Sequence, residues 1–412
     1  LRLALETVKR LRVGFGRDMN LLTSSMFPRR IVMGFLQVVR AIYFALLGFS
    51  PVEIGLLLSI ATFLSALHHI TFGYLCDRYG RKPFLILGTL FAAARTALFA
   101  VSTDFWMLAL AQSLGAMGEG VGAGQPVVSG YITDKVEAQD RPNIYSTMAI
   151  TNSLASTIGL SFGGLPILLE NRFAYDVVSA HQLLWWACTA VNLISLVFLF
   201  PLKEGRRVMR SDGKQGKGPG IKNWGVITKF SLTRSTSGLG WGMIDSLMTL
   251  YFFQRFMVGT DILGPIYAFA RFLSIFTYLV TPRVVERYGA IPTIVATRMI
   301  SAGVTVLFAL SSWYPMAVLF MVVNRIIVLF TMPIRQTFAS GMVSPEETAT
   351  AIGISNSARM GVRTLAPTLA GYMFESISMT LPFFTGAILM AVNGGLFWTF
   401  FRPRAPKNPP NP

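Results

Sequence analysis

The feature that most constrains this chain is a series of long apolar segments separated by short gaps, which hold most of the lysines and arginines. A membrane-spanning helix needs about 20 mostly apolar residues. Only 13% of the residues are charged, whereas soluble proteins carry about 25%. The pattern therefore predicts an all-α, multi-pass membrane protein with twelve spans, at 26–47, 51–75, 83–102, 105–132, 143–168, 181–201, 226–254, 261–283, 290–311, 313–337, 347–374 and 379–401.

The basic residues indicate how the chain is oriented. The formal net charge is +17, and the basic gaps all fall on one side of the predicted spans. Because loops rich in Lys and Arg stay in the cytoplasm, we expect a protein of the cell membrane with both termini cytoplasmic. No basic stripe interleaved with aromatic residues lies on a polar face, so nucleic-acid binding is not expected.

Composition also divides the chain. Residues 202–225 contain no apolar run and combine glycines with many basic residues, which is typical of a flexible linker. The predicted organisation is a basic cytoplasmic segment, a six-helix bundle, a basic linker, a second six-helix bundle and a cytoplasmic tail, at 1–25, 26–201, 202–225, 226–401 and 402–412.

The turn between the second and third predicted spans concentrates charge. It reads Gly-Tyr-Leu-Cys-Asp-Arg-Tyr-Gly-Arg-Lys over residues 73–82. Gly73 permits close helix approach, and Gly80 permits a bend with positive φ. Asp77 can accept hydrogen bonds from free N–H groups at a helix N-terminus. The basic side chains hold the turn on the cytoplasmic side: Arg78, Arg81 and Lys82.

This turn resembles the loop 2–3 signature of the major facilitator superfamily; the alternative is an ordinary basic turn. The resemblance implies a gate in which Asp77 and Arg81 lie close to Asp134, at the end of the fourth span. Asp77 should also approach the start of the eleventh span. A helix is predicted to begin there, because residues 344–347 read Ser-Pro-Glu-Glu, a capping box with Pro at the first helical position.

The chain also repeats itself. At a shift of 209 residues, 77–80 (Asp-Arg-Tyr-Gly) matches 286–289 (Glu-Arg-Tyr-Gly). After a small change in length, 150–153 echoes 354–357. This repeat predicts two pseudo-symmetric six-helix bundles, the arrangement of the major facilitator fold. The second copy of the turn lacks the basic pair, so the first copy is the better candidate gate.

Ionisable residues inside membrane spans are costly and usually face a bundle interior or a wet cavity. Candidates for substrate or ion coupling are Arg40, Glu119, Asp245, Arg271 and Arg325. Glu119 lies among glycines. A carboxyl group buried there would either act as a proton carrier or form a structural ion pair with Arg40. Three further arginines are interpreted as structural, because they lie near span ends: Arg95, Arg234 and Arg298. Arg359 and Arg363 lie one turn apart on one helix face, where they form either a cavity pair or, as we favour, a structural pair.

These features predict a secondary active transporter, not an enzyme, that moves a small organic solute by proton-coupled efflux as a monomer in the lipid bilayer. Alternatives are an organic-anion transporter using the mid-span arginines, and a lipid flippase or sensor on the same fold. The fifth span only partly resembles the antiporter signature of drug exporters, which leaves the direction of transport open. Neither the cysteines nor the histidines have metal-ligand spacing, so no metal or other cofactor is expected.

Overall fold

A computed structural model describes residues 16–118, 124–137, 140–204, 224–340 and 345–402, with some helix side chains left undescribed. The described residues are helical, with short turns and no strand. The chain divides into two compact units. Unit 1 comprises Leu1–Gln215 and Ser246–Ile275, and unit 2 comprises Gly216–Asp245 and Phe276–Pro412. The segment Ser246–Ile275 therefore belongs to unit 1, although it lies between two segments of unit 2 in the sequence. The predicted six-helix domains stay a prediction.

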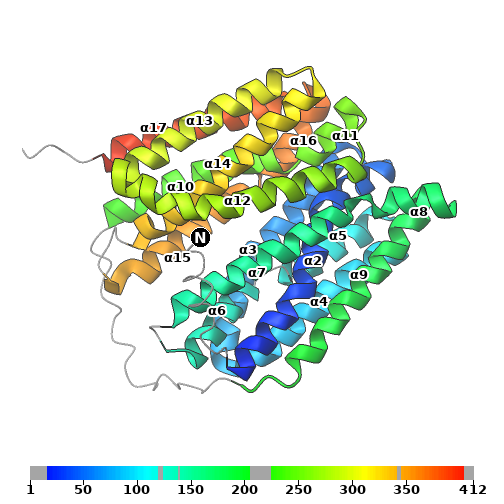
Figure 1. Ribbon diagram of the computed structural model, residues 1–412, viewed down its shortest axis with the longest axis horizontal. Helices are drawn as coiled ribbons and strands as arrows, with labels where there is room; N and C mark the ends of the chain where they lie inside the picture. Colours follow the sequence, from blue (N-terminus) through cyan, green and yellow to red (C-terminus); the bar gives the residue numbers. More distant parts are fainter. Residues whose placement is uncertain (1–15, 119–123, 138–139, 205–223, 341–344, 403–412) are drawn as a thin grey trace, which may run out of the picture. The chain divides into compact units, whose positions relative to one another are not determined.

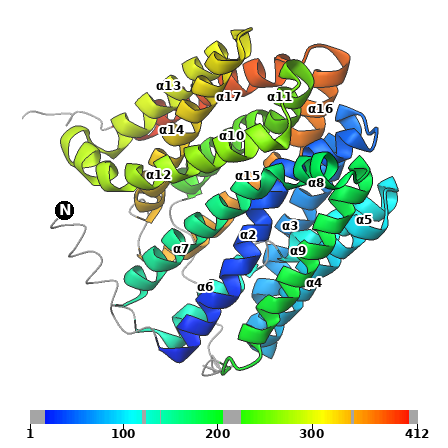
Figure 2. The ribbon, with the colours of Figure 1, turned by 45° about the vertical axis from the view of Figure 1, so that its right-hand side comes forward.

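In unit 1, α2, α4 and α9 lie side by side in both ribbon views (Figures 1 and 2). The helices of this unit are α2 (Arg17–Leu46), α3 (Pro51–Tyr79), α4 (Lys82–Val101), α5 (Phe105–Gly118), α6 (Gly124–Lys135), α7 (Arg141–Ser161), the 3-10 turn η1 (Phe162–Gly164), α8 (Leu165–Phe173), α9 (Val177–Leu199), α11 (Met248–Phe256) and α12 (Thr260–Tyr288) up to Ile275.

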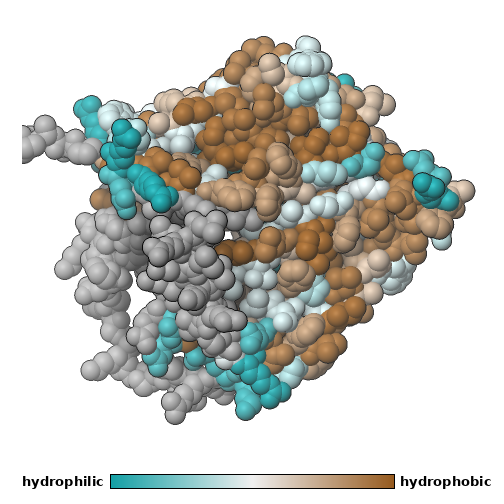
Figure 3. Space-filling view, viewed as in Figure 1, coloured by the Kyte–Doolittle hydropathy of each residue, from teal (hydrophilic) through white to brown (hydrophobic). Residues whose placement is uncertain are grey.

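Unit 2 contains the rest of α12 together with α10 (Trp224–Asp245), α13 (Ala290–Leu310), α14 (Tyr314–Ser340), α15 (Pro345–Arg363), α16 (Ala366–Ser376) and α17 (Leu381–Phe401). Helix α13 packs against α14 and α17, while α10 packs against α15 and α17. The face drawn in Figure 3 is strongly apolar over α13 and α14, as expected of helices that face lipid.

Seven helices of the described part are long and apolar enough to span a membrane. They are Pro51–His68, Lys82–Val101, Thr147–Phe173, Val177–Leu199, Ala290–Leu310, Tyr314–Met332 and Leu381–Phe401. Large apolar side chains on such helices are exposed, which suits a lipid environment better than water. Of the other predicted spans, 26–47 carries three arginines. Spans 105–132 and 261–283 include undescribed residues or side chains, and spans 226–254 and 347–374 are each divided between two helices.

Three predicted spans are interrupted instead of continuous, which corrects the sequence-based ranges. Residues 143–168 fall on α7, η1 and α8, and residues 347–374 on α15 and α16, because Pro166 and Pro367 each begin a new helix. Residues 226–254 form α10 and α11, which are separated at Ser246 and Leu247 without a proline. Asp245 and Ser246 favour an end there, because their side chains compete for backbone hydrogen bonds.

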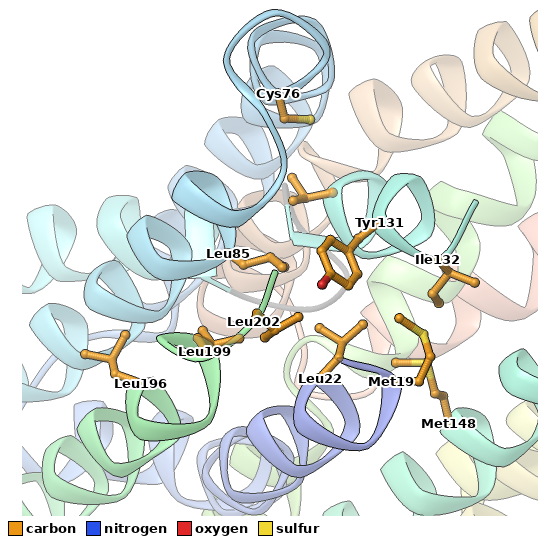
Figure 4. Packing of buried hydrophobic residues seen from close by; sticks show 11 residues of the cluster. Met19, Leu22, Cys76, Leu85, Tyr131, Ile132, Met148, Leu196, Leu199 and Leu202 are labelled. Carbon is orange, nitrogen blue, oxygen red and sulfur yellow. The ribbon is translucent and has the colours of Figure 1, made fainter. Parts of the chain in front are cut away.

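One hydrophobic cluster of unit 1 joins residues of six helices: α2, α3, α4, α6, α7 and α9. Tyr131 of α6 projects among leucines and methionines of α2, α4 and α9 (Figure 4), and its hydroxyl donates to the Lys203 carbonyl oxygen at 2.6 Å. Residues of the cluster are Met19, Leu22, Cys76, Leu85, Val127, Tyr131, Ile132, Met148, Leu196, Leu199 and Leu202. This packing holds the end of α6 beside the turn that joins α3 to α4.

Candidate functional site

The charged turn has the backbone that its glycine predicts. Helix α3 ends at Tyr79, Gly80 has a φ of 99°, and α4 begins at Lys82. In the second copy of the repeat, Gly289 has a φ of 82° between α12 and α13. Because L-residues with a Cβ rarely adopt this conformation, the same turn chemistry recurs in both copies of the repeat.

The structure brings Arg81 and Asp134 together. The Arg81 Nε atom lies 3.2 Å from Asp134 Oδ2, and the two side chains are 18% and 24% exposed. Gly130, one helical turn before Asp134, makes room, because an added Cβ would lie 2.5 Å from the Arg81 Cζ atom. The predicted ion pair is therefore present, while its action as a gate stays a prediction.

Other parts of the predicted gate are described only partly. Arg78 is exposed and stacks on the Tyr79 ring at 5.6 Å. The side chain of Asp77 lies outside the described residues, as does the environment of Gly73. Helix α15 begins at Pro345, as the sequence predicts, but its capping residues are likewise undescribed.

Sequence reasoning missed Glu204. Its carboxylate accepts hydrogen bonds from the backbone N–H groups of Arg81 at 2.6 Å and Lys82 at 3.2 Å. The Lys82 ammonium in turn donates to the Phe200 carbonyl oxygen at 2.6 Å. A carboxylate at a helix N-terminus satisfies free N–H groups and complements the helix dipole. Glu204 thus caps α4 from a distant part of the unit 1 sequence, and the only sequence signal was an acid in a basic linker.

A second ion pair joins α6 to α2. The Lys135 Nζ atom lies 2.8 Å from Asp18 Oδ2. Burial alone would raise the pKa of the Asp18 carboxyl, but hydrogen bonds from Lys135 and from the Lys203 backbone N–H hold that pKa below its usual value. Together with Arg81–Asp134, this pair attaches the end of α6 to two other segments of unit 1.

Replacing Asp18 by Asn should lower stability at neutral pH but not in acid. Since the pKa of Asp18 is lower in the folded state, the pair stabilises the protein above about pH 4 and this contribution is lost as pH falls further. We expect a loss of about 1 kcal/mol at pH 7, measured by thermal unfolding in detergent. Lys135→Met should remove the same pH dependence of stability. A loss of stability in Asp18→Asn that is as large at pH 3 as at pH 7 would contradict the assigned Asp18–Lys135 pair.

Loss of the Arg81–Asp134 pair should shift the balance between inward-open and outward-open states. We expect Arg81→Gln and Asp134→Asn each to change that balance about tenfold, since a charged hydrogen bond contributes about 1.5–3 kcal/mol. The measurement is the rate at which an impermeant maleimide labels single cysteines placed along α2, from either side of the membrane. Arg172→Gln, which removes an equal charge from an exposed position of unit 1 outside the predicted gate, is the control. Unchanged labelling in both variants would refute the gate, as would unchanged transport in Asp77→Asn.

Inside the spans, the structure pairs two candidate residues. Arg325 of α14 donates from Nη2 to Asp245 Oδ1 at 2.7 Å, and the side chains are 16% and 25% exposed. Asp245 is the last residue of α10. Gly242, one turn earlier, lies against Ala366 at the start of α16, where an added Cβ would come within 2.5 Å of the Ala366 Cβ. The ion pair therefore lies at the end of α10, where the seventh predicted span is interrupted, and Gly242 packs against the start of α16, where the eleventh is interrupted.

The remaining candidates lie in unit 1. Arg40 donates from Nη1 to the Gln112 Oε1 atom at 3.2 Å, and Gln112 is fully buried. Glu119, the other proposed partner of Arg40, lies outside the described residues. Arg271 is half-buried on α12, one turn before buried Ser274, whose hydroxyl donates to the Arg271 carbonyl oxygen. In the described part of the chain no three His, Cys, Asp or Glu side chains are placed to hold a metal ion.

Interrupted membrane helices, paired charges inside the spans and a charged turn between neighbouring helices define an integral-membrane transport protein. The family model described as Major Facilitator Superfamily matches residues 22–367 and 230–412, and the chain belongs to that superfamily. The predicted fold class is thereby confirmed, and members of this family are transporters rather than enzymes.

Two curated relatives illustrate the sequence similarity. The chain is 26% identical to the "Inner membrane transport protein YajR" of Escherichia coli over 203 residues, which is 47% of this chain and 42% of that protein. It is 23% identical to the "Multidrug resistance protein 1" of Bacillus subtilis over 323 residues, covering 77% of this chain and 79% of the relative. The match thus spans less than half of the first protein and most of the second.

Solved structures share the fold. A bacterial homologue of the human lysosomal transporter Spinster, in an inward-facing and occupied conformation, aligns with a TM-score of 0.76 at 16% identity, covering 94% of this chain and 97% of that chain. A D-xylose–proton symporter aligns with a TM-score of 0.72 at 13% identity, covering 93% and 97%. At these identities the likeness shows the fold alone.

Proposed function

We propose that this chain is a secondary active transporter that moves a small organic solute across the cell membrane by alternating access, coupled to protons and in the direction of efflux. The observation that carries this proposal is the Asp245–Arg325 ion pair at the end of α10, where the seventh predicted span is interrupted. In transporters, broken helices and paired ionisable residues mark substrate and ion sites.

The pair offers a simple coupling chemistry. A proton and the Arg325 guanidinium compete for the same Asp245 carboxylate, so protonation of Asp245 weakens this ion pair. Both side chains are partly exposed, which gives the proton a route to the carboxylate. A binding event that draws Arg325 away would favour proton uptake, and this reciprocity is what coupling requires.

The relatives support the direction and the coupling ion separately. Efflux is suggested by the names of the multidrug resistance proteins of Bacillus subtilis and Shigella flexneri. Proton coupling is suggested by the solved proton symporter. We further propose that the chain works as a monomer in the lipid bilayer.

Flux in proteoliposomes tests the proposal. Purified full-length chain is reconstituted, a pH gradient is imposed, and solute and proton movements are followed with radiolabelled solutes and a trapped pH dye. We expect solute movement against its gradient that a protonophore abolishes. Solute flux without proton movement would overturn the coupling, and the absence of flux for cationic, neutral and anionic solutes would favour the sensor alternative.

The proposed orientation has its own test. In a variant with Cys76 and Cys188 replaced by alanine, single cysteines placed within 205–220 should react with an impermeant maleimide only after the cell membrane is permeabilised. Cysteines at Ser50 or Ser378 should react in intact cells, because loops rich in Lys and Arg stay inside. The opposite labelling pattern would overturn the topology.

A further inference from the structure

Four arginines from four helices converge in unit 2. Arg234 lies on α10, Arg298 on α13, Arg335 on α14 and Arg359 on α15. Each of the four charges lies within electrostatic range of the other three. Arg298 is only 3% exposed, and the other three are half-buried. Like charges gathered this closely repel one another, so the cluster opposes folding unless something offsets it.

The partners of Arg234 and Arg335 are neutral. Arg234 donates from Nη2 to the Asn356 Oδ1 atom, and its guanidinium lies over the Phe230 ring, 5.6 Å from the centroid. Arg335 donates from Nη1 to the Ser237 hydroxyl at 3.4 Å. The Nε atoms of both arginines are buried and have no hydrogen-bond partner among the described residues.

The partners of Arg298 and Arg359 are weaker still. Arg298 approaches the Met390 sulfur through Nη1 at 3.2 Å, and its Nε and Nη2 atoms are buried with no partner in the described part of the chain. Arg359 approaches the Met360 sulfur at 3.8 Å, and its Nε atom is buried in the same way. A thioether is a weak acceptor, so donor capacity remains within the cluster.

No carboxylate neutralises these charges in the described part of the chain. The ion pairs found there are Arg81–Asp134, Lys135–Asp18 and Arg325–Asp245, and none includes the four arginines. Leaving a buried charge uncompensated costs several kcal/mol, and an unmade buried hydrogen bond adds to that cost. An anion with several acceptor atoms would offset both costs at once.

The packing holds the guanidinium groups in place. Gly238 of α10 lets Arg359 lie directly against the helix, because an added Cβ would be 2.8 Å from the Arg359 Cγ atom and from its carbonyl oxygen. Ser237 and Arg234 flank this contact on the same helix. Donors fixed in advance lose little entropy when an anion arrives, so this is a built site.

We propose that Arg234, Arg298, Arg335 and Arg359 bind the anionic oxygens of a carboxylate or phosphate group, and that the transported solute is an organic anion bearing such a group. Arginine presents a planar fork of donors that matches carboxylate and phosphate oxygens, and several forks can share one such group. The substrate class rests on the proposed transport function, whereas the anion site does not.

Thermal unfolding tests the site without requiring transport. The full-length chain is placed in phosphatidylcholine nanodiscs at constant ionic strength and titrated with succinate, glycerol 3-phosphate, inorganic phosphate or the cation tetraphenylphosphonium. A parallel sample contains phosphatidylglycerol, which offers a lipid phosphate. The variants are Arg298→Gln, Arg335→Gln and Arg298→Lys. Arg287→Gln is the matched control, because it removes an equal charge from an exposed position of unit 2.

We expect an organic anion to raise the unfolding midpoint of the wild type and of Arg287→Gln, because a ligand stabilises the state it binds. Its affinity should fall at least about tenfold in Arg298→Gln and Arg335→Gln, since each loses charged hydrogen bonds. Arg298→Lys keeps the charge but not the fork, so we expect a folded protein with weakened binding. This variant separates a binding defect from a folding defect.

Several results would overturn the proposal in whole or in part. One such result is that only inorganic phosphate or phosphatidylglycerol stabilises the protein, in a way that depends on the arginines. That result would keep the anion site but overturn the proposal that the substrate is an organic anion. Equal anion effects in wild type and both Gln variants, or stabilisation by the cation alone, overturn the site. Anion binding that depends on the arginines, in a chain that transports nothing in proteoliposomes, overturns the transport function and leaves the site standing.

Discussion

Replacing Asp245 by Asn is expected to reduce proton-driven transport at least about tenfold while leaving exchange of solute across the membrane in place. A neutral amide at this position cannot carry a proton, so the step that couples proton movement to the conformational change would be lost. The lost interaction is a charged hydrogen bond of 2.7 Å, and such bonds contribute about 1.5–3 kcal/mol. The measurement is solute uptake under a pH gradient beside counterflow at equal pH on both sides.

The control variants separate coupling from structure. The exchanged pair, Asp245→Arg with Arg325→Asp, should recover folding if Asp245→Asn merely destabilises unit 2. Glu119→Gln tests the other candidate carrier in the same assay. Full proton-driven transport in Asp245→Asn would remove Asp245 as carrier. Recovery of folding, of exchange and of proton-driven transport in the swapped pair would favour a purely structural ion pair.

Replacing Gly159 by Ala is expected to prevent unit 1 from packing. An added Cβ at Gly159 of α7 would lie 1.9 Å from the Ile31 carbonyl oxygen of α2, and one at Gly34 would lie 2.3 Å from the Ser156 carbonyl oxygen. Both obstacles are backbone atoms, which no side-chain rotation can move. Overpacking of a core costs about 1–3 kcal/mol, occasionally more, and a contact with backbone belongs at the upper end.

Gly303→Ala is the matched control for this substitution. Gly303 also lies inside a helix, but an added Cβ there meets nothing within 4 Å. Alanine is a better helix former than glycine by about 1 kcal/mol, so this variant should be as stable as the wild type or more so. The comparison is the yield of monodisperse protein and its unfolding midpoint. Equal yields and equal unfolding midpoints of Gly159→Ala and Gly303→Ala would contradict the close packing of α2 and α7.

Much of the fold is a local property of the sequence. Long apolar runs predict membrane helices because each helix satisfies its own backbone hydrogen bonds, and the all-helical fold is confirmed. The positive φ at Gly80 and the start of α15 at Pro345 follow from residue chemistry at single positions. The Arg81–Asp134 pair was expected from a family resemblance, not from local chemistry, and the structure contains it.

Other features were not readable from the sequence. The break in the seventh predicted span carries no proline or glycine signal at Ser246 and Leu247. Glu204 looked like one charge in a linker, yet it caps a helix that begins 122 residues earlier. Arg234 and Arg298 resembled isolated structural charges, Arg359 was paired with Arg363, and Arg335 had no place among the candidates.

The sequence by itself determined where helices form, which turns need glycine and which residues carry charge inside the spans. Only the tertiary structure decided which of those charges meet. Asp245 and Arg325 are 80 residues apart, and the four arginines of unit 2 come from four helices. Whether such side chains meet depends on how each helix is rotated and how deeply it packs, and those quantities are set by contacts with neighbouring helices rather than by any local pattern.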